Sequence, residues 1–216
     1  MPKIKAIVFD MDGVLIDAKQ WHFEALNRAL KLFGMEISYF EHIKSFDGLP
    51  TRDKLKMLSK AYPLSDRLHS FINKMKQIYT TELIHTRLKP NFTHEFALSR
   101  LKNEGYKLAL CSNSIQKTIA LMMEKAALAP YLDFFLSNED VKNAKPDPEI
   151  YEKAIARLKL SPQEVLIIED NINGITAAKA SKAWVMEVLG VEDVNYARIK
   201  KEISRCENLM KNEKKA

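Results

Sequence analysis

Residues 4–13 read IKAIVFDMDG, an apolar run that ends in two carboxylates, Asp10 and Asp12, followed by Gly13. A short run rich in β-branched residues predicts a buried strand. Open α/β sheets bind their ligands beyond the carboxyl ends of such strands. Because side chains alternate along an extended chain, residues two positions apart share one face. The two acids would repel each other there unless a divalent cation or a shared proton compensates.

This pair of acids has a chemical and a plain interpretation. A carboxylate held against a cation and a phosphate can act as a nucleophile, and a neighbouring carboxyl can act as general acid and base. In the plain interpretation the stretch is only a turn that ends the strand, since Asp and Gly are common turn residues. Residues further along the chain bear on this choice.

The composition is that of an ordinary globular protein. The chain has 216 residues, 46% of them hydrophobic, which allows one domain with an insertion or two small domains. Its net charge of +6 raises a nucleic-acid interpretation. Much of the excess lies near the C-terminal end, where Glu202, Glu207 and Glu213 are outnumbered by Arg198, Lys200, Lys201, Arg205, Lys211, Lys214 and Lys215. No basic stripe interleaved with aromatic residues occurs elsewhere, so we expect a solvated helix face and no nucleic-acid partner.

The sequence carries no sign of a membrane span or a signal peptide. No apolar stretch approaches the roughly 18 residues that a transmembrane helix needs, and the first residues lead directly into the predicted strand. We expect a cytoplasmic protein without a membrane partner. Cys111 lies in an apolar run, and neither it nor Cys206 has a partner at a metal-binding spacing, so both are expected to be structural.

The spacing of apolar residues divides the chain into a helical part and an alternating part. From Ala18 to about His85, apolar residues recur at intervals of three and four, which predicts helices and no strand; Thr51 is expected to cap one of these helices. After Pro90, strands and helices alternate. The strands are expected at 107–111, 134–136, 165–168 and 184–189, with helices at 95–103, 115–127, after Asp147 and at 174–180. Such units predict a mostly parallel sheet with helices on both faces.

The helical part interrupts the α/β part directly after the first strand. We expect residues 1–16 and 88–216 to form the α/β core and residues 17–87 to form a helical cap beside Asp10. A mobile cap in this position could exclude water and select substrates.

Polar residues recur at three further points of the α/β part. Ser112-Asn113-Ser114 follows a strand and precedes a helix, where hydroxyl and amide groups can hold an anion. Lys145 precedes another helix and could neutralise a phosphate. Glu169-Asp170 ends a strand, and two acidic strand ends could jointly supply the oxygen ligands that Mg²⁺ requires. Each of these motifs can also be explained without a functional site. Ser112-Asn113-Ser114 could be only a turn, Lys145 only an exposed lysine, and Glu169-Asp170 only a solvated loop. All of them together, in this order, favour an anion site with a metal.

These motifs resemble those of a known family. Asp10-Met-Asp12-Gly-Val, Ser112-Asn-Ser, Lys145-Pro-Asp-Pro and Glu169-Asp170-Asn-Ile-Asn-Gly are similar to the four motifs of the haloacid dehalogenase superfamily, and most similar to its β-phosphoglucomutase-like phosphatase branch. The resemblance extends from Ile4 to about Leu189. It implies a doubly wound, Rossmann-like parallel sheet with an all-helical cap inserted after the first strand.

The resemblance also implies roles for the acids. Asp10 would be the nucleophile that forms an aspartyl-phosphate. Asp12 would protonate the leaving alcohol and then deprotonate water, and its backbone carbonyl would help to bind Mg²⁺. Asp170 would complete the metal site with Asp10, and Glu169 would contribute directly or through another ligand. The dehalogenases of the family lack an acid at the position of Asp12, so its presence favours phosphate chemistry.

The remaining motifs would bind the phosphoryl group and the substrate. By the same resemblance, Ser112 and the amide of Asn113 would hold the transferring phosphoryl group, and Lys145 would balance its charge. In the cap, His22, Arg52 and Lys76 stand near positions that bind substrate in sugar-phosphate members of the family. For His22 and Arg52 the plain alternative is a residue on a helix surface. Two departures from the family pattern are Ala18, which replaces a hydroxyl residue, and Lys182-Ala183-Trp184, which replaces a Gly-Met pair.

From these observations we predict a Mg²⁺-dependent phosphatase, a monomer that hydrolyses a small phosphorylated metabolite, most simply a sugar phosphate. One alternative is a β-phosphoglucomutase-type phosphosugar mutase that uses the same nucleophile, although Ala18 weakens it. Another is a receiver-like signalling module that accepts a phosphoryl group without catalysis. The helical insert and the general acid Asp12 argue against the receiver, which has no leaving alcohol to protonate.

Overall fold

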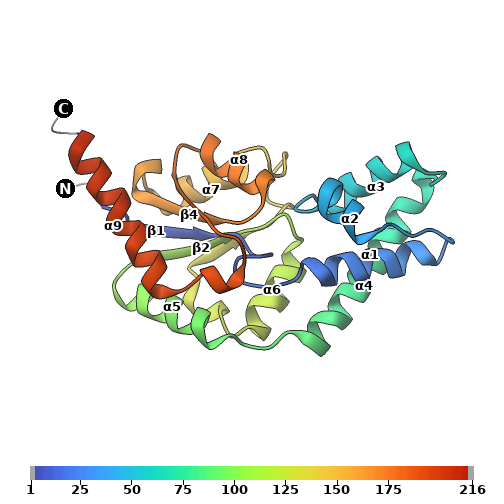
Figure 1. The fold of residues 1–216 in the computed structure, drawn as a ribbon, viewed down its shortest axis with the longest axis horizontal. Helices are drawn as coiled ribbons and strands as arrows, with labels where there is room; N and C mark the ends of the chain where they lie inside the picture. Colours follow the sequence, from blue (N-terminus) through green and yellow to red (C-terminus); the bar gives the residue numbers. More distant parts are fainter. Residues whose placement is uncertain (1–2, 214–216) are drawn as a thin grey trace.

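A computed structural model describes residues 3–213, which fold around a five-stranded parallel sheet (Figure 1). Lys214 and Lys215 of the basic tail lie outside the described residues. The strands are β1 (Ala6–Phe9), β2 (Lys107–Cys111), β3 (Phe134–Leu136), β4 (Val165–Glu169) and β5 (Trp184–Glu187), in the order β3-β2-β1-β4-β5. The chain starts in the central strand, fills one side of the sheet and then the other. The predicted doubly wound α/β fold is confirmed.

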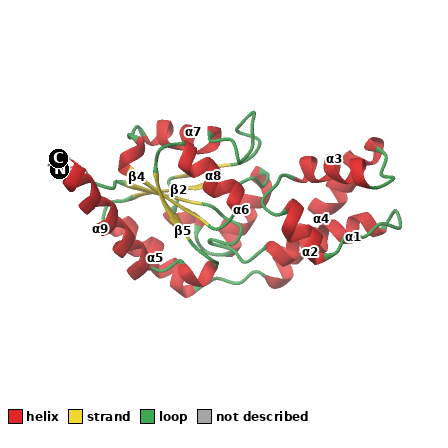
Figure 2. Ribbon diagram, turned by 45° about the horizontal axis from the view of Figure 1, so that its top comes forward, coloured by secondary structure: helices red, strands yellow, loops and turns green. Residues whose placement is uncertain are grey.

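Both faces of the sheet are covered by helices (Figures 1 and 2). Alternation along β1 sends Ile7 and Phe9 into one core and Ala6 and Val8 into another. The first core is closed by the helices α5 (Phe92–Asn103), α6 (Gln116–Lys125) and α9 (Tyr196–Glu213), and the second by α7 (Glu149–Leu158) and α8 (Ile172–Ala180). Strands that are buried on both sides need apolar residues at nearly every position, which is the pattern of the β1 sequence.

Between β1 and α5 the chain is helical, and this helical segment has a hydrophobic core of its own. It contains α1 (Lys19–Lys31), α2 (Tyr39–Glu41), a π-helical turn (His42–Phe46), α3 (Thr51–Ala61), a 3₁₀ turn (Asp66–Leu68) and α4 (His69–Arg87). Leu26, Leu30, Leu55, Leu58 and Ile72 are among the residues that pack together there. Figure 2 shows this helical group beside the end of the sheet rather than over either face. The exact division into core and cap stays a prediction.

Two helix starts differ from the expectation. Thr51 does not cap α3: it is the first residue of the helix, and Pro50 holds the extended cap conformation before it. α7 begins at Glu149, yet the Asp147 carboxylate accepts a hydrogen bond from the Glu149 amide at 3.0 Å, so Asp147 still supplies a cap.

The C-terminal helix α9 has one buried and one solvated face. Ile199, Ile203, Cys206 and Met210 pack into the core, whereas the basic residues Arg198, Lys201 and Arg205 are exposed. Within residues 3–213, no helix combines the length and the apolar character that crossing a bilayer demands.

Candidate active site

The ends of the three central strands bring Asp10, Ser112 and Glu169 to one edge of the sheet. β1 is hydrogen-bonded to both β2 and β4, so the residues that follow these strands become neighbours. The Asp10 amide continues the ladder and donates to the Ile168 carbonyl at 3.0 Å. Lys145 comes from the loop before α7. The topology therefore gathers four of the predicted motifs at the point where the strand order reverses.

The ammonium of Lys145 links two of the predicted acids. Its Nζ lies 2.6 Å from Asp10 Oδ1 and 2.7 Å from Glu169 Oε1, and it donates to the Cys111 carbonyl at 2.8 Å. Only 4% of the residue is exposed. Burial alone would lower the pKa of Lys145, but the two carboxylates outweigh it and raise that pKa. Lys145 is thus a fixed positive charge beside Asp10.

Asp10, Glu169 and Asp170 form a group that suits a divalent cation. Each offers a carboxylate oxygen, and these oxygens lie within 4.8 Å of one another. Burial and the charge of Glu169 raise the pKa of Asp10 well above its usual value, and burial raises the pKa of Asp170 to about 6. Asp170 Oδ1 is buried without a hydrogen-bond partner. Crowded acids and an unpartnered oxygen fit the all-oxygen site that Mg²⁺ prefers.

Two residues that the sequence did not single out contact this acidic group. The Tyr151 hydroxyl donates to Glu169 Oε1 at 2.5 Å and fixes that carboxylate from the side of α7. Lys19, the first residue of α1, places its Nζ 2.6 Å from Asp170 Oδ2 and so brings a cap cation to the predicted metal site. Nothing in the local sequence marks either residue, because both contacts depend on the tertiary fold.

The Asp12 side chain faces the cap rather than the acidic group. Its Oδ1 lies 3.1 Å from His22 Nε2, and its Oδ2 accepts a hydrogen bond from the Ser114 hydroxyl at 3.3 Å. Burial raises the pKa of Asp12, but His22, followed by Lys76 and Ser114, outweighs burial and lowers it. Because the side chain is engaged here, the predicted metal contact of Asp12 through its backbone carbonyl stays a prediction.

His22 connects Asp12 to a lysine of the cap. His22 Nδ1 lies 3.2 Å from Lys76 Nζ on α4. Burial lowers the pKa of His22, with Asp12 opposing, so the imidazole favours its neutral form. Burial and then the charge of Lys54 lower the pKa of Lys76 to about 7. The structure therefore joins two of the three predicted cap residues to the predicted general acid.

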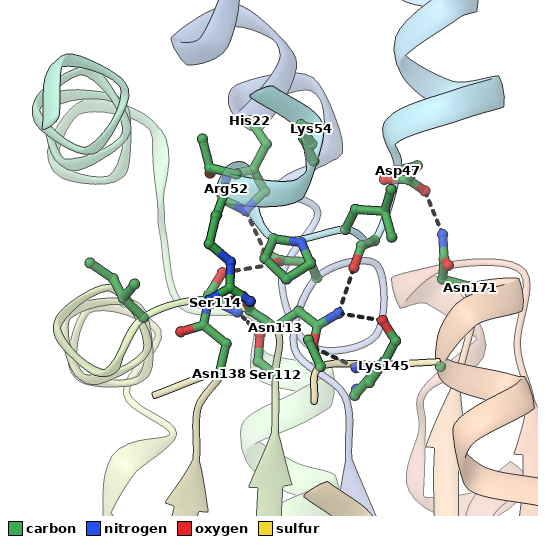
Figure 3. A pocket seen from close by; sticks show the side chains of 18 of the residues that line it. His22, Asp47, Arg52, Lys54, Ser112, Asn113, Ser114, Asn138, Lys145 and Asn171 are labelled. Carbon is green, nitrogen blue, oxygen red and sulfur yellow. Dashed lines mark hydrogen bonds and ion pairs between the residues drawn. The ribbon is translucent and has the colours of Figure 1, made fainter. Parts of the chain in front are cut away.

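The loop after β2 also joins the core to the cap. The Asn113 side chain donates to the Gly48 carbonyl at 2.8 Å and accepts from the Lys145 amide at 3.1 Å. The buried Ser112 accepts a hydrogen bond from the Ser114 amide at 3.1 Å, in the turn that leads to α6. Figure 3 shows Ser112, Asn113 and Ser114 lining one side of a cavity.

The cavity of about 450 Å³ lies between the sheet edge and the helical segment. Asp10, Asp12, Ser112, Asn113, Lys145 and Glu169 line it from below, and His22, Arg52, Lys54 and Lys76 line it from the cap. Arg52 is largely exposed, with 68% of its side chain accessible, and its Nε lies 3.5 Å from its neighbour Asp53. Lys54, which the sequence did not single out, is buried on the same helix.

Residues 47–50 close one side of this cavity. Asp47 Oδ2 accepts a hydrogen bond from Asn171 Nδ2 at 2.8 Å (Figure 3). The Asp47 carbonyl accepts a hydrogen bond from the Asn173 side chain at 3.3 Å. Gly48 adopts a φ of +73°, and a Cβ there would come within 2.6 Å of Asn171 Oδ1. The close approach of cap and core at this point requires glycine.

A family model described as haloacid dehalogenase-like hydrolase matches residues 7–188. The chain belongs to this family. A phosphorylated carbohydrates phosphatase of Thermotoga maritima is 34% identical over 191 residues, which are 87% of this chain and 85% of the relative. A phosphoglycolate phosphatase of Nitrosospira multiformis is 28% identical and aligns over 84% and 82% of the two chains.

Solved structures agree with this membership at the level of the fold. The crystal structure of β-phosphoglucomutase from Clostridium difficile superimposes with a TM-score of 0.80, covering 94% of this chain and 98% of that one at 23% identity. The resemblance predicted from the four motifs is therefore confirmed, and so is the prediction of a hydrolytic enzyme of the haloacid dehalogenase-like family.

Proposed function

We propose that this haloacid dehalogenase-like hydrolase is a Mg²⁺-dependent phosphatase that acts on a small phosphorylated carbohydrate through an aspartyl-phosphate at Asp10. The observation that carries the proposal is the geometry around Asp10. A buried carboxylate held by the Lys145 ammonium shares one cavity with the Asp12–His22 pair. Such an arrangement offers a nucleophile, a positive charge for the phosphoryl group, and a proton donor.

In the first half of the reaction, Asp10 attacks phosphorus and the bond from phosphorus to the leaving oxygen breaks. Asp12 gives its proton to that oxygen, and the alcohol departs. The negative charge of an arriving phosphate opposes ionisation of Asp12, which favours the protonated form needed at this step. Lys145 and the Ser112 loop hold the phosphoryl oxygens while charge moves between them.

In the second half, Asp12 takes a proton from water, whose oxygen attacks phosphorus and releases Asp10. The Asp12 carboxylate is set for this step because the His22 contact favours its ionised form. When bound, Mg²⁺ would be held by Asp10, Glu169 and Asp170 and would neutralise the charge between these carboxylates and the phosphoryl group. Closure of residues 17–87 over the site would exclude bulk water.

The substrate class rests on relatives and on the cap. The relative from Thermotoga maritima is named for phosphorylated carbohydrates, and the cavity offers His22, Arg52 and Lys76 to the part of the substrate that is not transferred. A planar guanidinium such as that of Arg52 suits a sugar oxygen or a phosphate. The relatives are named as phosphatases, so the mutase alternative is not favoured.

The test compares Asp10→Asn with the control Asp66→Asn, which changes an exposed cap carboxylate. Hydrolysis of p-nitrophenyl phosphate is measured with Mg²⁺ and with a chelator. We expect activity in the wild type and Asp66→Asn only when Mg²⁺ is present, and a loss of about 10³-fold or more in Asp10→Asn. Undiminished hydrolysis by a folded Asp10→Asn protein would refute the proposal.

A further inference from the structure

Lys54 of α3 is a buried lysine whose charge is unpaired within residues 3–213. The residue is only 6% exposed, and its ammonium takes part in none of the hydrogen bonds and ion pairs found there. It lines the cavity from the cap, above the core residues (Figure 3). Burial of a charge without a partner destabilises a protein, so such a residue usually has a function that compensates.

The groups around Lys54 are mostly basic or polar. Lys76 lines the same cavity from α4, and one turn earlier Asn73 has a buried Oδ1 without a hydrogen-bond partner. Burial lowers the pKa of Lys54 to about 8, and Lys54 in turn helps to lower that of Lys76. Burial, and then the charge of Lys54, lower the pKa of the buried His42 to about 3.

The acids nearest to Lys54 are engaged with other partners. Asp47 accepts a hydrogen bond from Asn171 and lies 3.7 Å from Lys19. Asp12 contacts His22 and Ser114. Both carboxylates only partly offset the effect of burial on Lys54. The cap side of the cavity therefore keeps an excess of positive charge that no described side chain neutralises.

We propose that Lys54 and Lys76 form a second anion subsite, which selects substrates that carry a phosphate or carboxylate in addition to the transferred phosphoryl group. This inference rests on the proposed phosphatase function and narrows its substrate class. The subsite lies on the cap, opposite Lys145, so one ligand can reach both. Asn73 Oδ1 is placed to accept a hydrogen bond from a substrate hydroxyl. Because burial already removes part of the hydration of both lysines when the protein folds, an anion binds them at a reduced desolvation cost on the protein side.

Binding is measured by calorimetry with Mg²⁺ in an Asp10→Asn background, which prevents turnover. One ligand pair is fructose 1,6-bisphosphate against fructose 6-phosphate; the other is 6-phosphogluconate against glucose 6-phosphate. We expect the ligand with two anionic groups to bind about tenfold or more tightly in at least one pair. A preference in the first pair identifies phosphate as the second group, and one in the second pair identifies carboxylate.

Variants of Lys54 test the residue itself. Lys54→Met is expected to remove most of that preference and Lys54→Arg to keep it, whereas Lys56→Met, an exposed lysine on the same helix, serves as the control. Because Lys54→Met removes an unpaired buried charge, the Tm of this variant should equal or exceed that of the parent protein. If Lys54→Met does not fold, Lys54→Gln is used in its place. The proposal is overturned if neither pair shows a preference, or if Lys54→Met keeps the preference of Lys56→Met. Hydrolysis of p-nitrophenyl phosphate by the protein with Asp10 intact tests the phosphatase function separately.

Discussion

Lys145 and Lys54 are buried to a similar extent, at 4% and 6% exposure, but their surroundings differ. Lys145 lies between two carboxylates, and its pKa is raised by them against the effect of burial. Lys54 has no such partners and a lowered pKa. Lys145 stays charged and already has two counter-charges within the protein before any substrate arrives. Lys54 still lacks a counter-charge, which is the physical basis for assigning it to the substrate.

His22 is expected to act through Asp12. In His22→Ala, Asp12 loses the group that lowers its pKa most, so the limb of the pH profile of kcat/KM that belongs to Asp12 should move to higher pH. We also expect kcat to fall by about tenfold to a hundredfold, because Asp12 is no longer positioned. The control is His85→Ala, an exposed histidine on α4. A pH profile of His22→Ala that superimposes on the wild type would contradict this role.

Lys19 is expected to compete with the metal ion for Asp170. Its ammonium lies 2.6 Å from Asp170 Oδ2, so a cation that binds there must displace or tolerate it. Lys19→Met should bind Mg²⁺ about threefold or more tightly at pH 8, measured by calorimetry. Lys31→Met, at the exposed far end of the same helix, should keep the wild-type affinity. Weaker Mg²⁺ binding in Lys19→Met would mean that Lys19 helps to organise the site instead.

At the scale of elements, the strands and the residues at their ends were predictable, whereas several contacts to them were not. The interiors of strands β1, β2 and β4 are apolar because both faces of the sheet are covered, and the polar residues at the ends of these strands stand out against that background. Tyr151 and Lys19 reach the site from helices, where their neighbours give no such contrast. The sequence analysis missed Lys54 for the same reason. In a helix that carries several lysines, the sequence does not show which lysine faces a cavity.

Gly48 tests whether the loop before α3 must lie against the core. Gly48→Ala should lower kcat/KM by about tenfold or more, because the added Cβ would collide with Asn171 and hold the cavity open. Gly34→Ala is the matched control: its φ is also positive, at +68°, but a Cβ there meets nothing within 4 Å. Both should lose about 1 kcal/mol of stability from backbone strain, measured by urea unfolding. Equal kcat/KM values for the two variants would exclude a role for this contact.

For the whole molecule, the parallel sheet and the helical insert followed from the order of apolar patterns along the chain. Thr51 as a cap was wrong because helix starts depend on local turns, and here Pro50 already holds the cap conformation. Which cap residues meet which core residues could not be predicted. Arg52 and Lys54 are two positions apart on α3 and so face different sides of that helix. The packing of α3 against the rest of the cap decides which side is buried, and it buries Lys54 and leaves Arg52 exposed.

The unpaired Lys54 should also affect how stability depends on pH. Burial lowers the pKa of Lys54 from 10.5 to about 8 in the folded protein. Between these two pH values the unfolded chain binds more protons than the folded protein, so the free energy of unfolding rises with pH. Lys54→Met should therefore be more stable than the wild type below pH 8, and its advantage should shrink as the pH approaches 10.5. Each pKa unit corresponds to about 1.4 kcal/mol. Urea unfolding at several pH values measures the difference; a constant difference would show that Lys54 does not titrate in this range.

The central claim is that phosphorus is attacked first by Asp10 and only then by water. The stereochemical course of hydrolysis tests it most directly, with a thiophosphate ester made chiral at phosphorus by two oxygen isotopes and hydrolysed in water that carries the third. Each in-line displacement inverts phosphorus, so two successive displacements predict net retention in the released thiophosphate. Net inversion would mean that water attacks the substrate directly, and it would contradict the role of Asp10 as nucleophile.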